Sequence, residues 1–211
     1  AAFFKNRGIQ VTEVESITQY PSILGGRVKT LHPKVFGGIL SRSNEEEDQI
    51  ELEKFNIPQF DLVVVDLYPF QDTVKSGAEE VDIIEKIDIG GISLIRAGAK
   101  NFNDVVIIPS KDQYADLTKI LRNGAKTDLA QRRSLASDAF NVTKSYDSAI
   151  SSYFIGESFG ENKTLRYGEN PHQKGSIYIS NYNDKELGMR QLGGKEPVSY
   201  THLTLPTICS V

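Results

Sequence analysis

The sequence predicts an α/β fold in which a parallel sheet carries helices on both faces. Two apolar runs carry this prediction, residues 61–65 (Asp-Leu-Val-Val-Val) and 104–108 (Asp-Val-Val-Ile-Ile). Continuous apolar stretches of this length are typical of strands that are buried on both faces of a sheet. The clearest helical pattern is over 128–158, where apolar residues recur every three or four positions. Strands that alternate with helices through short loops form parallel sheets.

Four segments are expected before the first of these strands. Residues 1–8 have the pattern of the last turns of a helix that ends at Gly8, and residues 9–14 that of a short strand. Residues 22–40 are rich in glycine and proline, a composition that predicts an ordered loop. An acidic helix with a solvated face is expected over 44–55.

Capping patterns predict where the later helices begin and end. Ser followed three positions later by Glu or Gln favours a helix start, and Gly after a periodic stretch favours a helix end. On these patterns we expect a helix over 76–87 that begins at Ser76 and Glu79, a helix over 92–100 after Gly90-Gly91, and a helix that begins at Ser110 and Gln113 and ends at Gly124. The aromatic residues of 128–158 are expected to pack in the core or in a dimer.

Composition excludes several classes of function. The net charge of -4 over 211 residues argues against a general binder of nucleic acids or membrane surfaces. Apolar runs fall far short of the roughly 20 residues that a membrane-spanning helix needs. The single cysteine, Cys209, excludes an intramolecular disulfide and favours the reducing cytoplasm. No His or Cys cluster has metal-ligand spacing, so no metal site is expected.

A basic glycine-containing loop, residues 25–33 (Gly-Gly-Arg-Val-Lys-Thr-Leu-His-Pro), is the first candidate site. Its two glycines allow backbone amides to approach an anion, while Arg27 and Lys29 supply charged donors and Thr30 adds a hydroxyl. The spacing is not that of a P-loop. An exposed basic loop without a ligand explains the same residues equally well.

Polar residues also follow the first predicted strand. Ligands in open α/β sheets bind outside the carboxyl ends of the strands, where Asp66 and Tyr68 fall. The alternative is that Tyr68 and the proline after it only pack a turn. No nucleophile elbow is present, and Cys209 has no base near it in the sequence, so nucleophilic hydrolysis has no support.

Three further candidates each have a structural alternative. Asp88, before Ile89-Gly90-Gly91, either caps a helix or joins the backbone amides in holding a ligand. Lys100 is either a cation favoured by the helix dipole or part of a site. Arg166 and Tyr167 offer a phosphate fork and a stacking ring, or belong to a capped loop.

Five segments in this order, residues 26–33, 66–70, 87–91, 97–101 and 165–173, closely resemble the bifunctional purine enzymes that join an AICAR transformylase to an IMP cyclohydrolase. The resemblance covers about residues 1–196. It implies a methylglyoxal-synthase-like fold, followed by the start of a second α/β domain, the transformylase. It implies that the first part closes formyl-AICAR to IMP with loss of water and without a cofactor. For the whole enzyme it implies 10-formyltetrahydrofolate as co-substrate of the transformylase and a homodimer.

The resemblance also assigns roles to residues. Catalytic roles fall on Tyr68, Asp88 and Lys100, with Lys100 as proton donor or acceptor. Substrate-binding roles fall on Arg27, Lys29, Thr30, Val65, Asp66, Ile89, Gly90, Gly91, Arg166 and Tyr167. Asp66 stands where the family more often has Asn, so it can only accept a hydrogen bond where Asn could also donate one.

The domain organisation follows from the same resemblance. We expect residues 1–158 to form the cyclohydrolase domain without its first strand and Ser-Thr-Gly-Gly-Thr phosphate loop, which would precede Ala1 in a longer protein. Residues 159–196 are expected to be a linker and the start of the transformylase, and 197–211 a non-native tail. The alternative functions are an allosteric nucleotide-binding module with a methylglyoxal-synthase-like fold, as in carbamoyl phosphate synthetases, and a remnant without activity.

Overall fold

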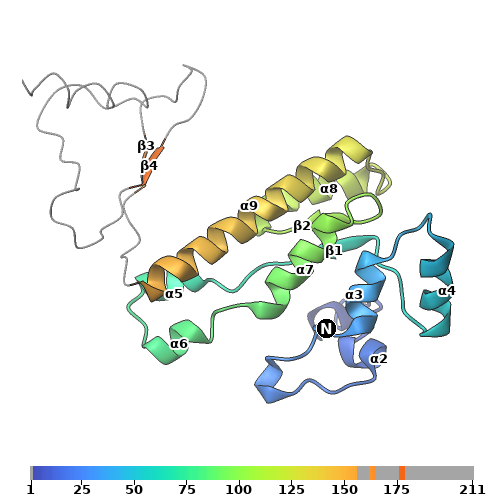
Figure 1. Ribbon diagram of the computed structural model, residues 1–211, viewed down its shortest axis with the longest axis horizontal. Coiled ribbons are helices and arrows are strands. Elements are labelled where there is room, and N and C mark those ends of the chain that lie inside the picture. Colours follow the sequence, from blue (N-terminus) through green and yellow to red (C-terminus); the bar gives the residue numbers. More distant parts are fainter. Residues whose placement is uncertain (1, 156–161, 165–175, 179–211) are drawn as a thin grey trace, which may run out of the picture. The chain divides into compact units, whose positions relative to one another are not determined.

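The computed structural model describes residues 2–155, 162–164 and 176–178, and divides the chain into two compact units, Ala1–Asp147 and Ser148–Val211. Its elements are drawn in Figure 1. In chain order they are α1 (Ala2–Lys5), α2 (Val14–Thr18), η1 (Leu24–Gly26), α3 (Pro33–Leu40), α4 (Glu46–Lys54), β1 (Leu62–Val64), α5 (Phe70–Lys75), α6 (Glu80–Ile84), α7 (Ile89–Lys100), β2 (Val106–Ile108), η2 (Lys111–Gln113), α8 (Tyr114–Arg122), α9 (Leu129–Phe154), β3 (Asn162–Thr164) and β4 (Ser176–Tyr178).

The two apolar runs pair as neighbouring parallel strands, as expected. β1 pairs with β2 in the register Leu62↔Val106, Val63↔Ile107 and Val64↔Ile108. Helix α7 contacts both strands and also contacts α3, and Figure 1 shows it alongside the sheet. The α/β class with a parallel sheet and helices is therefore confirmed.

Close packing of α7 on the sheet depends on small residues near the end of the helix. A Cβ built on Gly98 would lie 3.2 Å from Cδ1 of Ile107. Ile95 of α7 and Ile107 of β2 are fully buried at this contact layer. Leu135 and Ala139 of α9 belong to the same apolar core. The core therefore lies where α7, α9 and the strands meet.

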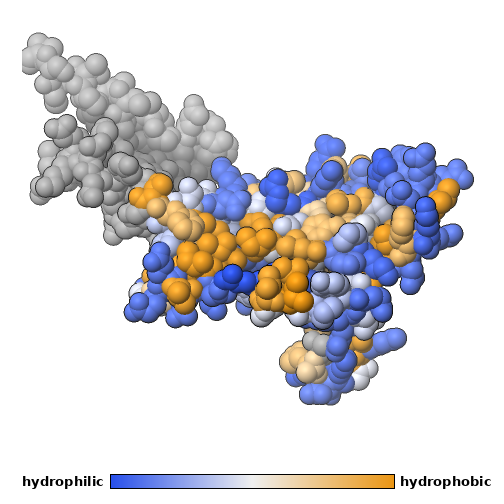
Figure 2. Space-filling model, turned by 60° about the horizontal axis from the view of Figure 1, so that its bottom comes forward, coloured by the Kyte–Doolittle hydropathy of each residue, from blue (hydrophilic) through white to orange (hydrophobic). Residues whose placement is uncertain are grey.

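Burial of β1 differs from the expectation of a strand covered on both faces. Val63 is buried, but Leu62 is 36% and Val64 40% exposed. Val63 and its partner Ile107 lie on the same face of the sheet, and α7 covers that face. Leu62 and Val64 point to the opposite face, because successive residues of a strand alternate. Among the described residues nothing covers that opposite face fully at β1. Figure 2 shows hydrophobic residues gathered in a band on one face of the molecule.

The expected strand over 9–14 is wrong. Residues 9–13 form neither helix nor strand, and Val14 begins α2 after Glu13. No strand within 2–155 pairs with this segment, and an extended segment needs such a partner to form a sheet ladder.

The expected helix start at Ser76 is also wrong. Ser76 ends α5, and its Oγ donates a hydrogen bond to the carbonyl of Thr73. Gly77 follows with a φ of +71°, the left-handed conformation that commonly ends a helix. The next helix, α6, begins only at Glu80, so the Ser-x-x-Glu pattern spans a helix end and not a helix start.

Several local signals are confirmed. Gly8 and Gly124 both have a left-handed φ just after α1 and α8. Ser110 Oγ accepts a hydrogen bond from the amide of Asp112 at the start of η2. The acidic helix and the long amphipathic helix are α4 and α9. No helix in the described part of the chain is long and apolar enough to cross a membrane.

The second unit contains the last turns of α9 and one antiparallel pair. β3 pairs with β4 in the register Asn162↔Tyr178, Lys163↔Ile177 and Thr164↔Ser176.

Candidate functional site

The basic loop is ordered by backbone hydrogen bonds across its base. Ile23 and Val28 exchange two such bonds, the amide of each donating to the carbonyl of the other, at 3.1 and 3.4 Å. Gly25 has a φ of +67°, which glycine adopts without strain, and so allows the tight turn between them. His32 then caps α3, since its Nδ1 accepts a hydrogen bond from the amide of Lys34.

Both cations of the loop have carboxylate partners. Arg27 forms an ion pair with Glu85, and Lys29 Nζ lies 3.1 Å from Glu15 Oε1. The Glu85 carboxylate raises the pKa of Arg27 above its ordinary value. Exposed pairs of this kind contribute little to stability, because water screens them. A phosphate could therefore replace either carboxylate at little cost.

Asp88 caps the first turn of α7, so the helix begins at Ile89, three residues before the expected start. Its Oδ1 accepts a hydrogen bond of 2.6 Å from the amide of Gly91. A Cβ built on Gly91 would lie only 2.5 Å from Asp88 Oδ2. A side chain at position 91 would therefore displace the Asp88 carboxylate from the position in which it caps the helix.

The basic loop lies against this first turn. A Cβ built on Gly90 would lie 3.0 Å from the hydroxyl oxygen of Thr30. The structure therefore brings Thr30, Asp88, Gly90 and Gly91 together at the N-terminus of a helix of 12 residues. Backbone amides and the helix dipole favour an anion at such a terminus, and Thr30 can donate a further hydrogen bond to it.

Tyr146 of α9 fixes the segment that leads into Asp88. Its phenol accepts a hydrogen bond of 2.9 Å from the amide of Asp88 and donates one of 2.7 Å to the carbonyl of Lys86. Burial raises the pKa of this phenol above its ordinary value of 10.0, so the donating form is retained. The sequence pattern gave this residue only a packing role. The one available signal was the hydroxyl, since a buried Tyr usually has a hydrogen-bond partner.

Tyr68 lies near the same segment. The residue is 56% exposed, and the Nζ of Lys86 is 5.9 Å from the centroid of its ring. Ile89, which the resemblance predicts to contact substrate, is 57% exposed at the helix start. These two side chains are accessible to a ligand in the described structure.

Val65 and Asp66 lie at the carboxyl end of β1. The amide of Val65 donates to the carbonyl of Ile108 at 3.0 Å, so it extends the ladder. Asp66 accepts a hydrogen bond from the hydroxyl of Tyr114, which raises the pKa of that phenol. The other oxygen of Asp66, Oδ1, is buried and has no hydrogen-bond donor among the described residues.

Asp66 lines a polar cleft of about 590 Å³ at the carboxyl ends of the two strands. Ser110, Lys111 and Tyr146 also line it. Because Tyr146 also bonds to Asp88, this cleft adjoins the α7 terminus. Of the two residues expected at a site beyond the strand end, Asp66 lines this cleft and Tyr68 does not.

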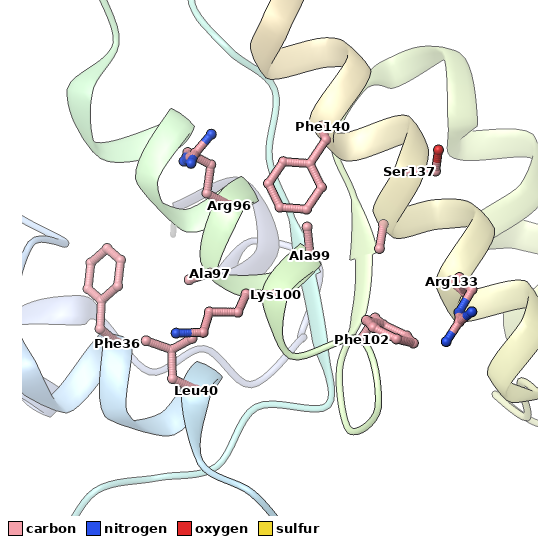
Figure 3. Close-up of a pocket in the computed structure, with 11 residues that line it drawn as sticks. Phe36, Leu40, Arg96, Ala97, Ala99, Lys100, Phe102, Arg133, Ser137 and Phe140 are labelled. Carbon is pink, nitrogen blue, oxygen red and sulfur yellow. The ribbon is translucent and has the colours of Figure 1, made fainter.

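Lys100 is not brought to Asp88. It occupies the last turn of α7, whereas Asp88 precedes the first. Twelve residues of α-helix span about 18 Å at 1.5 Å each. Lys100 lines a different groove, and Figure 3 shows its ammonium near Leu40.

The remaining expected residues lie outside the described part of the chain. These are Arg166 and Tyr167. Within the described ranges, no three His, Cys, Asp or Glu side chains gather in a group that could hold a metal ion.

Comparisons with known proteins match two family models to successive parts of the chain, and relatives to nearly all of it. Residues 1–93 match the MGS-like domain, and residues 98–204 match the AICARFT/IMPCHase bienzyme family. The bifunctional purine biosynthesis protein PurH of Bacteroides thetaiotaomicron is 54% identical over 209 residues, which is 95% of this chain and 40% of that protein. PurH of Persephonella marina is 44% identical over 218 residues, 96% of this chain and 42% of that protein.

A solved structure, described as the crystal structure of ForH, is similar with a TM-score of 0.58 and 32% identity. The match covers 73% of this chain and 80% of that one. The chain spans about two fifths of the length of the two PurH proteins. On the match of residues 98–204, about half of the sequence, the chain belongs to the AICARFT/IMPCHase bienzyme family.

Proposed function

We propose that residues 1–158 are the IMP cyclohydrolase part of a bifunctional purine-biosynthesis enzyme, closing formyl-AICAR to IMP with loss of water. The observation that carries the proposal is the contact of Thr30 with Gly90 at the Asp88-capped start of α7. A loop with two cations meets the start of a helix there, a combination that suits a nucleotide with its base against Gly90-Gly91 and its anionic part near Arg27 and Lys29. The cyclohydrolase needs no metal or cofactor in this proposal.

The ring closure depends mainly on positioning. The carboxamide nitrogen attacks the formyl carbon of the same molecule, so holding the two groups together lowers much of the barrier. Tyr68 or a backbone amide that Asp88 does not occupy, such as that of Gly90, would stabilise the developing oxyanion. Asp88 would orient the attacking amide, and Lys100 would carry the proton transfers.

Other parts of the proposal concern the whole protein. Residues 159–196 would be the linker and the start of the AICAR transformylase, with Arg166 and Tyr167 at its substrate phosphate and 10-formyltetrahydrofolate as its co-substrate. Residues 197–211 would be a non-native tail. We propose a homodimer in the cytoplasm, acting on purine nucleotides.

Titration of the 211-residue chain with IMP tests the nucleotide site. A hydrogen bond to a charged group contributes about 1.5–3 kcal/mol. Thr30→Val keeps the shape of the side chain but removes its hydroxyl, so Kd should rise at least about tenfold. Thr118→Val is the matched control, because the Thr118 hydroxyl bonds only within α8. Equal affinity of the wild-type chain and Thr30→Val for IMP would contradict the assignment of Thr30.

A measurement of formyl-AICAR turnover distinguishes the proposed cyclohydrolase from the alternative function, a nucleotide-binding module. Incubation with formyl-AICAR, followed by chromatography of IMP, should give product with the wild-type chain. The observation that favours the module is the separation of about 18 Å along α7 between Asp88 and Lys100 in one copy of the chain. Tight IMP binding without product formation would support the nucleotide sensor and contradict the cyclohydrolase.

A further inference from the structure

Two acidic side chains pair with the cations of the basic loop, residues 25–33. Nε and Nη2 of Arg27 donate to the two carboxylate oxygens of Glu85, so this pair is bidentate. Nζ of Lys29 lies 3.1 Å from Oε1 of Glu15. The charges of these four residues cancel, although the loop taken alone offers two charged donors to a phosphate.

The carboxylate of Glu85 has a single partner in the described part of the chain. It accepts hydrogen bonds only from Arg27. Asp88, three positions later, differs in this respect, because its carboxylate caps α7 through the amide of Gly91. The side chain of Glu85 is 51% exposed. Its carboxylate can therefore leave Arg27 for water without breaking another hydrogen bond that the structure describes.

The backbone that carries Glu85 is held on both sides of this residue. Glu85 is the C-cap of α6, and its amide donates to the carbonyl of Val81 at 3.1 Å. The next carbonyl, that of Lys86, accepts a hydrogen bond of 2.7 Å from the phenol of Tyr146. The carboxylate is thus kept within reach of Arg27, and only the side chains must be ordered when the pair forms.

We propose that Glu85 and Glu15 are internal counter-ions, which compete with the phosphate of the nucleotide for Arg27 and Lys29 and so lower the affinity of the site. The inference rests on the proposed function, in which the anionic part of the nucleotide lies near these two cations. A phosphate monoester carries a charge of about −1.5 to −2 at pH 7. This charge is close to that of the two carboxylates together, so the exchange leaves the charge around the loop nearly unchanged.

The size of the competition follows from the exposure of the two ion pairs. A ligand that binds only to the free site has its affinity reduced by the fraction of chains in which the site is free. For exposed ion pairs of ordinary strength, this fraction is about one sixth to two fifths. Removal of one carboxylate should therefore tighten the binding of phosphate about two- to sixfold. The effects of Glu85 and Glu15 should multiply, because the two residues belong to separate pairs.

Calorimetric titration of the full 211-residue chain with IMP tests the competition. Glu85→Gln keeps the shape of the side chain but removes its charge, so the Kd for IMP should fall about two- to sixfold. Glu15→Gln should act in the same direction. Glu80→Gln is the matched control and should bind as wild type, because Glu80 is an exposed carboxylate of α6 without an ion pair in the described ranges. A Kd of Glu85→Gln equal to or above that of the wild type overturns the proposal, as does an equal gain for inosine, which lacks the phosphate.

A titration with inorganic phosphate separates this inference from the proposed function. Followed by the ¹⁵N signal of Arg27 Nε, it should give a lower Kd in Glu85→Gln than in the wild type. If this gain appears but neither protein binds IMP, the counter-ions stand and the nucleotide assignment fails. If the wild type binds IMP but Glu85→Gln improves the Kd for neither ligand, the nucleotide assignment stands and the counter-ion proposal fails.

Discussion

Replacing Tyr146 by Phe removes one hydroxyl that satisfies two backbone groups. The phenol accepts from the amide of Asp88 at 2.9 Å and donates to the carbonyl of Lys86 at 2.7 Å. The edge-to-face contact of its ring with Phe70, at 6.3 Å between centroids, is retained in the variant. Each hydrogen bond contributes about 0.5–1.5 kcal/mol, so Tyr146→Phe should lower the free energy of unfolding by about 1–3 kcal/mol.

The pH dependence isolates the same hydroxyl. Burial raises the folded-state pKa of Tyr146 above 10.0, its ordinary value in an unfolded chain. The protonated phenol is therefore favoured by folding, and its contribution is complete below pH 10 and lost as the pH rises through the folded-state pKa. Tyr146→Phe lacks this loss, so the stability difference between the two proteins should shrink above pH 10.

Urea unfolding followed by circular dichroism measures both effects. Tyr20→Phe is the control, because the exposed phenol of Tyr20 makes no hydrogen bond in the described chain, and it should unfold as wild type. A loss below about 0.5 kcal/mol in Tyr146→Phe, or a stability difference that stays constant from pH 8 to pH 11, would refute the anchoring role.

Two further substitutions test the packing of α3. Ala is normally favoured over Gly inside a helix by about 1 kcal/mol, but Gly38→Ala would put a Cβ 2.0 Å from the carbonyl oxygen of Pro58. We therefore expect Gly38→Ala to lower the free energy of unfolding, measured in urea, by about 2 kcal/mol or more. An increase in stability would contradict the close approach of α3 to Pro58. Asn101→Ala removes a buried amide that donates to the carbonyls of Ile39 and Ser41 at 2.9 and 2.8 Å. It should lower the free energy of unfolding by about 1–3 kcal/mol in the same assay, and an unchanged urea midpoint would contradict those hydrogen bonds.

Local signals in the sequence predicted local structure well. The two valine-rich runs predict the paired strands, and Asp88 before Gly90-Gly91 is one of the signals that indicate the helix start. The pattern at Ser76 failed because the same residues suit a helix end, and the left-handed glycine that follows decided the outcome. Capping patterns alone cannot distinguish the two ends when two short helices adjoin.

Contacts between distant residues could not be predicted in this way. Arg27 pairs with Glu85, and Tyr146 bonds to Asp88, each across 58 positions. No periodicity or spacing indicates such contacts, because they depend on how the loop and α9 meet the start of α7. The separation of Asp88 from Lys100, by contrast, follows from helix rise alone once the helix is known to begin at Ile89.

The close contact at Gly98 fixes the distance between α7 and the sheet. With no side chain between this point of the helix and Ile107, the backbone of α7 rests directly on a fully buried side chain of β2. Packed interiors of this kind resist compression, so the helix cannot move closer to the sheet at this point. A side chain larger than glycine at position 98 would instead push α7 away from β2. Because Gly90 and Lys100 belong to the same helix, one such substitution would displace both ends of α7, including the turn that contacts Thr30.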